Sequence, residues 1–252
     1  MHNSTLLLKL SNITQMSEVN NNNENLVKSK KRVADHGEVF TSEREVNAML
    51  DMVKQETERI ESRFLEPACG NGNFLIEVLK RKLEVVSGRY KNSQLEWERY
   101  AITAVSSMYG VDILQDNVAE CRERLFLIFD DIYTKLFKTE ASNDCRNATR
   151  FILSKNILWG DALSLKTPDE EAKPIVFSEW SPVNGSLIKR RDFSLANLLQ
   201  GDIHHYNKKI SKKTPNQHGL FSNDKDPAFL PKSIQEFPPT HFLKLYEAEN
   251  QL

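Results

Sequence analysis

Residues 63–79, RFLEPACGNGNFLIEVL, decide the fold of this chain. A short strand is expected at 63–66, and apolar residues recur at helical spacing from position 74 onward. Between them, Gly70 and Gly72 lack a Cβ, so the backbone there can turn tightly and approach a ligand closely. In an open α/β sheet the ligand crevice lies at the carboxyl end of a strand. Two glycines alone favour an ordinary turn, whereas the whole string EPACGNGNF favours a ligand-binding loop.

Predicted strands and helices alternate after this stretch. Helices are expected at 95–107 and 117–137, and strands at 109–113, 157–159 and 175–177. Strands that alternate with long helices imply an α/β fold with a doubly wound, mostly parallel sheet, which is the Rossmann-like class. The sheet is expected to stop at the strand 175–177 and to lack its last strands.

The chain is expected to have three parts. Residues 1–32 are rich in Asn, Ser and charge and are predicted to form a disordered arm. Residues 33–185 are expected to form the ligand-binding domain, with Ser42 and Glu45 placed as a helix capping box. Residues 186–252 are expected to be a basic, partly irregular C-terminal segment.

The composition excludes several classes of protein. The formal net charge is −1, so any nucleic-acid surface must be a local patch. Three scattered cysteines are too few for a disulfide framework or a zinc ribbon and fit a reducing cytoplasm. His204-His205 has no carboxylate or cysteine nearby and is interpreted as surface, so no metal is expected. No apolar run can span a bilayer, and the N-terminus is a poor signal peptide. We expect a cytoplasmic protein without a membrane partner.

The string at 66–74 resembles the S-adenosylmethionine (SAM) motif of the amino-methylating DNA methyltransferases, in which acid-Pro-Ala/Pro-x-Gly-x-Gly-x-Phe recurs. Residues 37–42, GEVFTS, are similar to the Gly-x-x-Phe-Thr-Pro segment of the adenine-N6 branch, except that Ser42 replaces proline. By this resemblance, Phe40 and Thr41 would close over the methionine end of SAM. A plain helix cap at 41–42 is compatible with the same residues.

Two further segments extend the resemblance to residues 37–165. Asp112, after a predicted strand, matches the family's acceptor for the ribose hydroxyls, and Ile113 would pack on the adenine face. Asp161, in GDAL at 160–163, matches the acceptor for the adenine amine. The resemblance implies the SAM-dependent methyltransferase fold and a cofactor site made of Phe40, Thr41, Glu66, Ala68, Gly70, Gly72, Asp112, Ile113 and Asp161.

The family's next motif, Asn/Asp/Ser-Pro-Pro-Tyr/Phe, is altered here. At its place the chain has Trp180, Ser181, Pro182 and Val183, so the second proline is missing and valine replaces the aromatic residue. The resemblance implies Ser181 and Pro182 as catalytic acceptors for the target amine, with Trp180 as the stacking face for a flipped base. A turn with a partly buried tryptophan is the alternative.

The remaining stretch is short and basic. Lysine and arginine cluster at 189–191 and 208–213, either as a phosphate-binding patch or as a solvated face. The resemblance implies methylation of DNA adenine at N6 in a restriction-modification or related defence system, with DNA as partner. The alternative is a non-catalytic SAM-binding subunit completed by a partner chain, which an open sheet edge near 175–177 would recruit. A small-molecule or RNA methyltransferase is less favoured because residues 37–42 resemble the DNA branch.

Overall fold

A computed structural model of the chain describes residues 27–199 and 231–251. The chain divides into two compact units, Met1–Val53 and Lys54–Leu252. Most of the predicted disordered arm lies outside the described residues, as do His204-His205 and the basic run at 208–213.

The first unit contains helices α2 (Lys30–His36) and α3 (Glu43–Asp51). The capping box that the sequence predicts is present, because Ser42 Oγ accepts from the Glu45 amide and the Glu45 carboxylate accepts from the Ser42 amide. Helix α2 is a correction, since it includes residues 30–32, which were expected to be disordered. Its start is stabilised by Ser29, whose hydroxyl accepts from the Arg32 amide at 3.1 Å.

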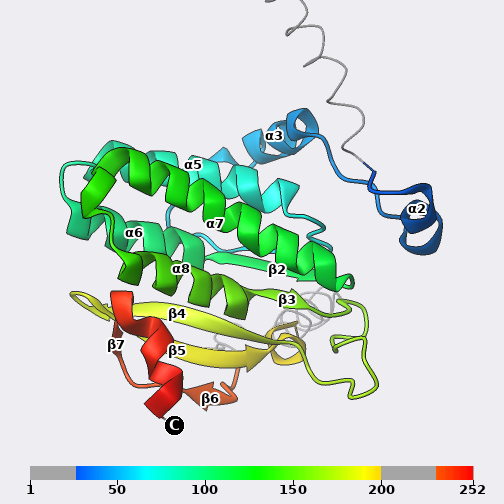
Figure 1. Cartoon of the computed structure of the whole chain (residues 1–252). Helices are drawn as coiled ribbons and strands as arrows, with labels where there is room; N and C mark the ends of the chain where they lie inside the picture. Colours follow the sequence, from blue (N-terminus) through cyan, green and yellow to red (C-terminus); the bar gives the residue numbers. More distant parts are fainter. Residues whose placement is uncertain (1–26, 200–230, 252) are drawn as a thin grey trace, which may run out of the picture. The chain divides into compact units, whose positions relative to one another are not determined.

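The second unit alternates helices and strands (Figure 1). Helices α6 and α7 confirm the predictions for 95–107 and 117–137 to within two residues. The elements in chain order are α4 (Lys54–Thr57), β1 (Phe64–Glu66), α5 (Asn73–Tyr90), α6 (Gln94–Ser106), β2 (Met108–Asp112), α7 (Gln115–Phe137), η2 (Lys138–Glu140), α8 (Asn143–Asn156), β3 (Ile157–Trp159), β4 (Val176–Asn184), β5 (Leu187–Ser194), β6 (Gln235–Glu236), β7 (Thr240–His241) and η3 (Phe242–Gln251).

Strands β1, β2 and β3 form a parallel sheet in the order β1-β2-β3. The same order, counted from the other edge, is the 3-2-1 half of the Rossmann arrangement. Strand β2 is central and fully buried, whereas β1 and β3 are edge strands among the described residues. The structure therefore confirms an α/β fold with a parallel sheet, which is compatible with the Rossmann-like class.

The expected fourth parallel strand at 175–177 was wrong. Strand β4 begins at Val176 but pairs antiparallel with β5, and the pair belongs to a second sheet with β6 and β7. The local reason is the Asn184-Gly185 dipeptide, with Gly185 at φ 53°, since Asn-Gly favours the tight turn of a hairpin. The expected domain boundary after residue 185 falls inside this turn.

The start of the β4–β5 hairpin packs against one face of the parallel sheet. Tyr109 of β2 meets Phe177 edge-on, with ring centroids 5.4 Å apart, and its hydroxyl donates to the Ser178 carbonyl at 3.2 Å. Val111, Ile175 and a helical segment at 195–199 complete this apolar cluster. The hairpin therefore covers a sheet face that a further helix would cover in a fully doubly wound fold.

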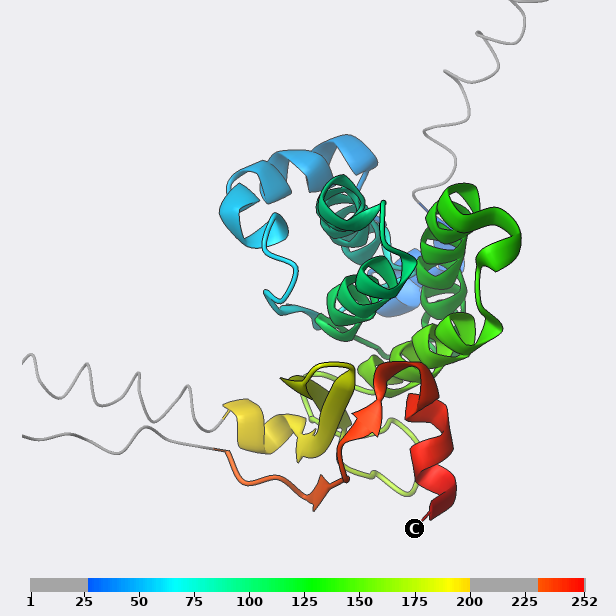
Figure 2. The same ribbon diagram turned by 90° about the vertical axis from the view of Figure 1, so that its left-hand side faces the viewer.

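The other face of the hairpin is held by a buried ion cluster. The Arg190 guanidinium donates to both oxygens of Asp192 at 2.8 Å, to Ser178 Oγ at 3.0 Å and to Glu249 at 2.9 Å. It also lies 4.2 Å from the Phe237 ring centroid. Because Glu249 belongs to η3, this cluster fastens the end of the described chain to the hairpin, and η3 lies beside α8 (Figures 1 and 2).

Candidate functional site

The glycine loop, residues 67–72, joins β1 to α5 at the carboxyl end of the sheet. Its backbone is tied to β2 twice, because the Cys69 amide donates to the Val111 carbonyl at 2.9 Å and the Gly70 amide donates to Asp112 Oδ2 at 2.8 Å. Gly70 and Gly72 have φ angles of 51° and 92°, in the left-handed region that favours glycine. The loop is thus a fixed turn at the position where α/β sheets bind ligands.

Gly72 also has a packing role. A Cβ at this position would lie 2.7 Å from Cys121 Sγ of α7, which is shorter than any normal contact. Gly72 is the N-cap of α5 and provides no side-chain acceptor for the first amides of that helix. Close helix packing and a ligand-binding turn therefore both require glycine here.

Asp112 ends β2 with a buried carboxylate. Its Oδ1 accepts from the Leu114 amide at 2.9 Å and from Asn117 Nδ2 at 3.2 Å, and its Oδ2 accepts from Gly70. A carboxylate has about four acceptor positions, so about one remains for a ligand hydroxyl. Asp112 therefore has a structural task, which is to hold the glycine loop against the end of the central strand.

Glu66 and Asp161 lie at the same edge of the sheet. Glu66 is the last residue of β1, and burial raises the pKa of its carboxyl group. Asp161 follows β3 and accepts from the Leu163 amide at 2.9 Å, a hydrogen bond that lowers its pKa. Because β1, β2 and β3 are parallel neighbours, the structure brings Glu66, Asp112 and Asp161, three residues of the cofactor site that the resemblance implies, to one end of the sheet.

An apolar surface adjoins these acids. Ile113, directly after Asp112, is 45% exposed, and Ala68 in the glycine loop is exposed as well. The indole N–H of Trp159 donates to the Ile113 carbonyl at 2.9 Å and fixes the backbone there. An exposed isoleucine beside a carboxylate suits a ligand with a flat apolar part and hydroxyl donors.

Phe40 and Thr41 belong to the first unit. Phe40 is buried and Thr41 is exposed, directly before the Ser42 cap of α3. Their expected contact with a bound cofactor stays a prediction.

The expected catalytic residues lie far from the glycine loop. Trp180 is only 6% exposed, and its indole N–H donates to Asn156 Oδ1 at 3.2 Å, just before β3 begins. Asp112 is the register partner of Trp159, which comes three residues after Asn156. At about 3.3 Å per residue, Asp112 therefore lies about 10 Å further along the sheet than Asn156. The burial of Trp180 favours the structural alternative for this residue over a stacking face.

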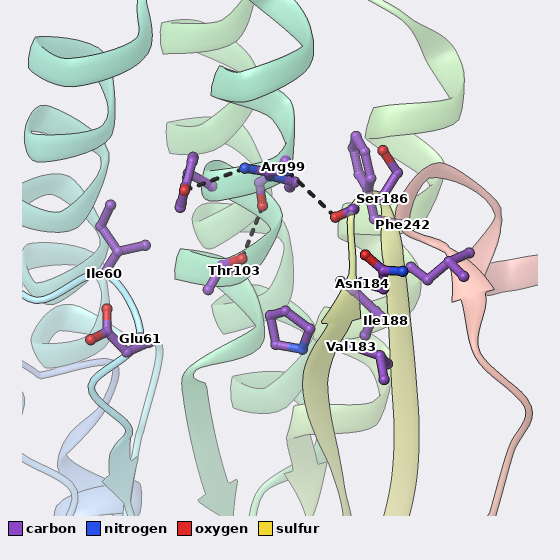
Figure 3. Close-up of a pocket in the computed structure, with 13 residues that line it drawn as sticks. Ile60, Glu61, Arg99, Thr103, Val183, Asn184, Ser186, Ile188 and Phe242 are labelled. Atoms are coloured by element: carbon purple, nitrogen blue, oxygen red, sulfur yellow. Dashed lines mark hydrogen bonds between the residues drawn. The ribbon is translucent and has the colours of Figure 1, made fainter.

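Ser181 and Pro182 follow Trp180 in β4 and lie further from the glycine loop. They pair with Lys189 and Ile188 of β5, and Pro182 lines a cavity of about 350 Å³ with residues of α6 and the segment before β1. Figure 3 shows this cavity between Arg99 and Thr103 of α6 and the hairpin turn at 183–186. The structure therefore does not bring the expected catalytic and cofactor-binding residues together.

Two side chains of α7 hold the glycine loop in place by hydrogen bonds that the sequence did not predict. Arg124 Nη1 of α7 donates at 2.8 Å to both the Asn71 carbonyl and Asn73 Oδ1, and Glu120 accepts from Asn71 Nδ2 at 3.1 Å. Glu120 and Arg124 are one helical turn apart and face the loop together. No local pattern signals them, because their partners are about fifty residues earlier in the chain.

The comparisons with known proteins leave the family open. Protein-family models, curated proteins and solved structures were all compared with the chain, and nothing matches it. Within residues 27–199 and 231–251, no cluster of three or more His, Cys, Asp or Glu side chains is arranged to hold a metal ion. In the same ranges, no helix combines the length and the apolar composition that crossing a bilayer requires.

Proposed function

We propose that this chain binds SAM at the carboxyl end of its parallel sheet. One observation carries the proposal: Glu66, Asp112 and Asp161 end or follow three adjacent parallel strands, beside a loop whose two glycines have left-handed backbone angles. Nucleoside cofactors bind at this edge of Rossmann-like sheets.

The donor set fits this cofactor. SAM has hydroxyl donors on its ribose, an amine on its adenine and a positive sulfonium, and this edge offers carboxylate acceptors. Asp112 keeps about one acceptor position for a ribose hydroxyl, Asp161 is accessible for the adenine amine, and the exposed Ile113 can cover the adenine ring. When bound, SAM supplies a methyl group for transfer, and the chain's own residues hold and orient the cofactor.

For the reaction, we propose methylation of DNA adenine at N6 within a defence system, with the chain acting as the SAM-binding subunit. The placement of Trp180, Ser181 and Pro182 supports this form over an enzyme that is complete by itself. Trp180 is buried and bonded to Asn156, about 10 Å along the sheet from the level of Asp112, and Ser181 and Pro182 lie further along β4. The groups that hold the target base therefore come from a partner chain.

Calorimetry with SAM and with its demethylated product S-adenosylhomocysteine tests cofactor binding. We expect micromolar affinity for both. Asp112→Ala should weaken binding by about 1.5–3 kcal/mol, the range for a hydrogen bond to a charged group. Because Asp112 also holds the glycine loop, Asp161→Asn is the cleaner variant, and Asp131→Asn on the exposed surface of α7 is its matched control. No heat and no thermal shift with either ligand would refute the proposal.

A separate assay tests whether DNA methylation requires a partner chain. Transfer of tritium from labelled SAM to genomic DNA should be slight with the purified chain and should appear when the product of a neighbouring gene is added. Robust adenine methylation by this chain alone, as a monomer, would overturn the subunit proposal and leave cofactor binding intact.

A further inference from the structure

A second cavity, of about 400 Å³, lies between the parallel sheet and the β4–β5 hairpin. None of the residues expected to bind SAM lines it. On the sheet side, Leu65 and Tyr109 are paired neighbours on β1 and β2, and on the hairpin side Phe177 and Phe193 are paired neighbours on β4 and β5. The apolar residues Leu198 and Pro231 also line the cavity. This volume is in the range of small-molecule sites, which are about 300–1,000 Å³.

Three charged side chains share this cavity. Glu179 pairs with Arg191 across the hairpin, with Arg191 Nη2 2.7 Å from Glu179 Oε2, and it also forms an ion pair with Arg63 at the start of β1. Two guanidinium groups on one carboxylate leave one positive charge in excess, and the neighbouring Glu236, opposite Arg191 on β6, is itself paired with Lys189. A single negative charge on a ligand would balance it.

The exposed end of the Arg191 guanidinium is the part that a ligand can reach. The Arg191 side chain is 36% exposed, and it pairs with Glu179 through Nη2, whereas its Nε is buried. The Arg191 guanidinium carbon lies 5.8 Å from the Phe193 ring centroid, so the charged group adjoins an aromatic ring that lines the cavity. A planar oxyanion suits this position, because guanidinium binds carboxylates with paired, coplanar hydrogen bonds.

The remaining wall is apolar and adds no negative charge. Tyr109 and Phe177 pack edge-to-face, and the Tyr109 hydroxyl is already used on the Ser178 carbonyl. Burial raises the pKa of Tyr109 to about 12, so its phenol is neutral at pH 7. Leu65 is 45% exposed at the mouth, an apolar surface that a ring can cover.

We infer that this cavity binds a small planar aromatic molecule with one carboxylate. Its ring lies against Leu65, Phe177 and Phe193, and its carboxylate meets Arg191 and Arg63. The site is separate from the proposed SAM site, and its occupant is a monoanion because the cluster has one positive charge in excess.

Two matched probes on the wild-type chain test this inference. 2-Naphthoate has the ring and one negative charge, whereas 2-naphthamide has the same shape without the charge. Calorimetry should give saturable binding of 2-naphthoate, with the amide about tenfold weaker or more, the loss expected for hydrogen bonds to a charged partner. No saturable binding of the carboxylate, or equal affinity for the two probes, would overturn the inference.

Variants locate the site. Arg191→Met should weaken 2-naphthoate at least about tenfold. Arg150→Met is the matched control, because Arg150 also pairs with a glutamate and lies on a phenylalanine ring, but on the outer face of α8. Leu65→Trp should block the cavity from its exposed mouth and reduce binding of the carboxylate without changing SAM binding. If 2-naphthoate binds equally to wild type, Arg191→Met and Leu65→Trp, the site lies elsewhere and the inference fails.

Discussion

Lys82 is fully buried on helix α5, and its charge should make the stability of the chain depend on pH. Its ammonium donates to the Ile60 carbonyl at 3.1 Å, to Ser107 Oγ at 2.6 Å and to the Ser62 carbonyl, where the chain enters β1. Burial lowers the pKa of Lys82 from 10.5 to about 7. Between these two values the unfolded chain holds a proton that the folded chain has released.

The sign and size of the effect follow from this difference. Stability rises with pH wherever the unfolded state binds more protons, by about 1.4 kcal/mol per pH unit for one proton. For Lys82, with a folded pKa of about 7, the free energy of unfolding should rise by about 2 kcal/mol from pH 7 to pH 9. Below pH 7 both states bind the proton, so the contribution is constant there.

Urea denaturation at pH 7, 8 and 9 measures this rise. The decisive quantity is the difference between wild type and Lys82→Met, because the contributions of groups that the two proteins share cancel in it. Lys135→Met on α7 is the control, because the pair of Lys135 with Asp131 is exposed and should contribute little. If Lys82→Met keeps the wild-type pH dependence, or if that of Lys135→Met changes equally, the reasoning about Lys82 is refuted.

Two further predictions concern packing. Arg190→Ala leaves Asp192 buried without its partner and should lower the free energy of unfolding by about 3–5 kcal/mol. Arg150→Ala, which breaks a half-exposed pair, should cost about 1 kcal/mol or less by the same urea titration. Equal losses would contradict the role of the buried cluster. In thermal melts, Gly72→Ala should destabilise the chain because its Cβ meets Cys121 Sγ, whereas Gly88→Ala, with open space in the same helix, should stabilise it by up to about 1 kcal/mol. A Gly72→Ala protein that melts at or above the wild-type temperature would show that α7 can shift without loss.

The sequence by itself determined the elements that depend on local patterns. Helical periodicity located α6 and α7, the Ser42 capping box located the start of α3, and the glycine string located the turn between β1 and α5. The family resemblance grouped Glu66, Asp112 and Asp161 in one cofactor site, and the structure has them at one end of the sheet because the carboxyl ends of parallel strands lie together. These features depend on residues a few positions apart, or on one general rule of parallel sheets.

Only the tertiary structure decided the direction of the chain after β3. The apolar run at 175–177 suits a parallel strand and an antiparallel one equally, and the Asn184-Gly185 turn selects the hairpin. The Asn184-Gly185 turn could be predicted from the sequence, but the sheet face that the hairpin covers could not. This face depends on contacts between residues far apart in the chain, such as Tyr109 with Phe177, and those contacts hold Trp180 and Ser181 away from the glycine loop. Local spacing carries no information about such distances, because packing between whole elements sets them.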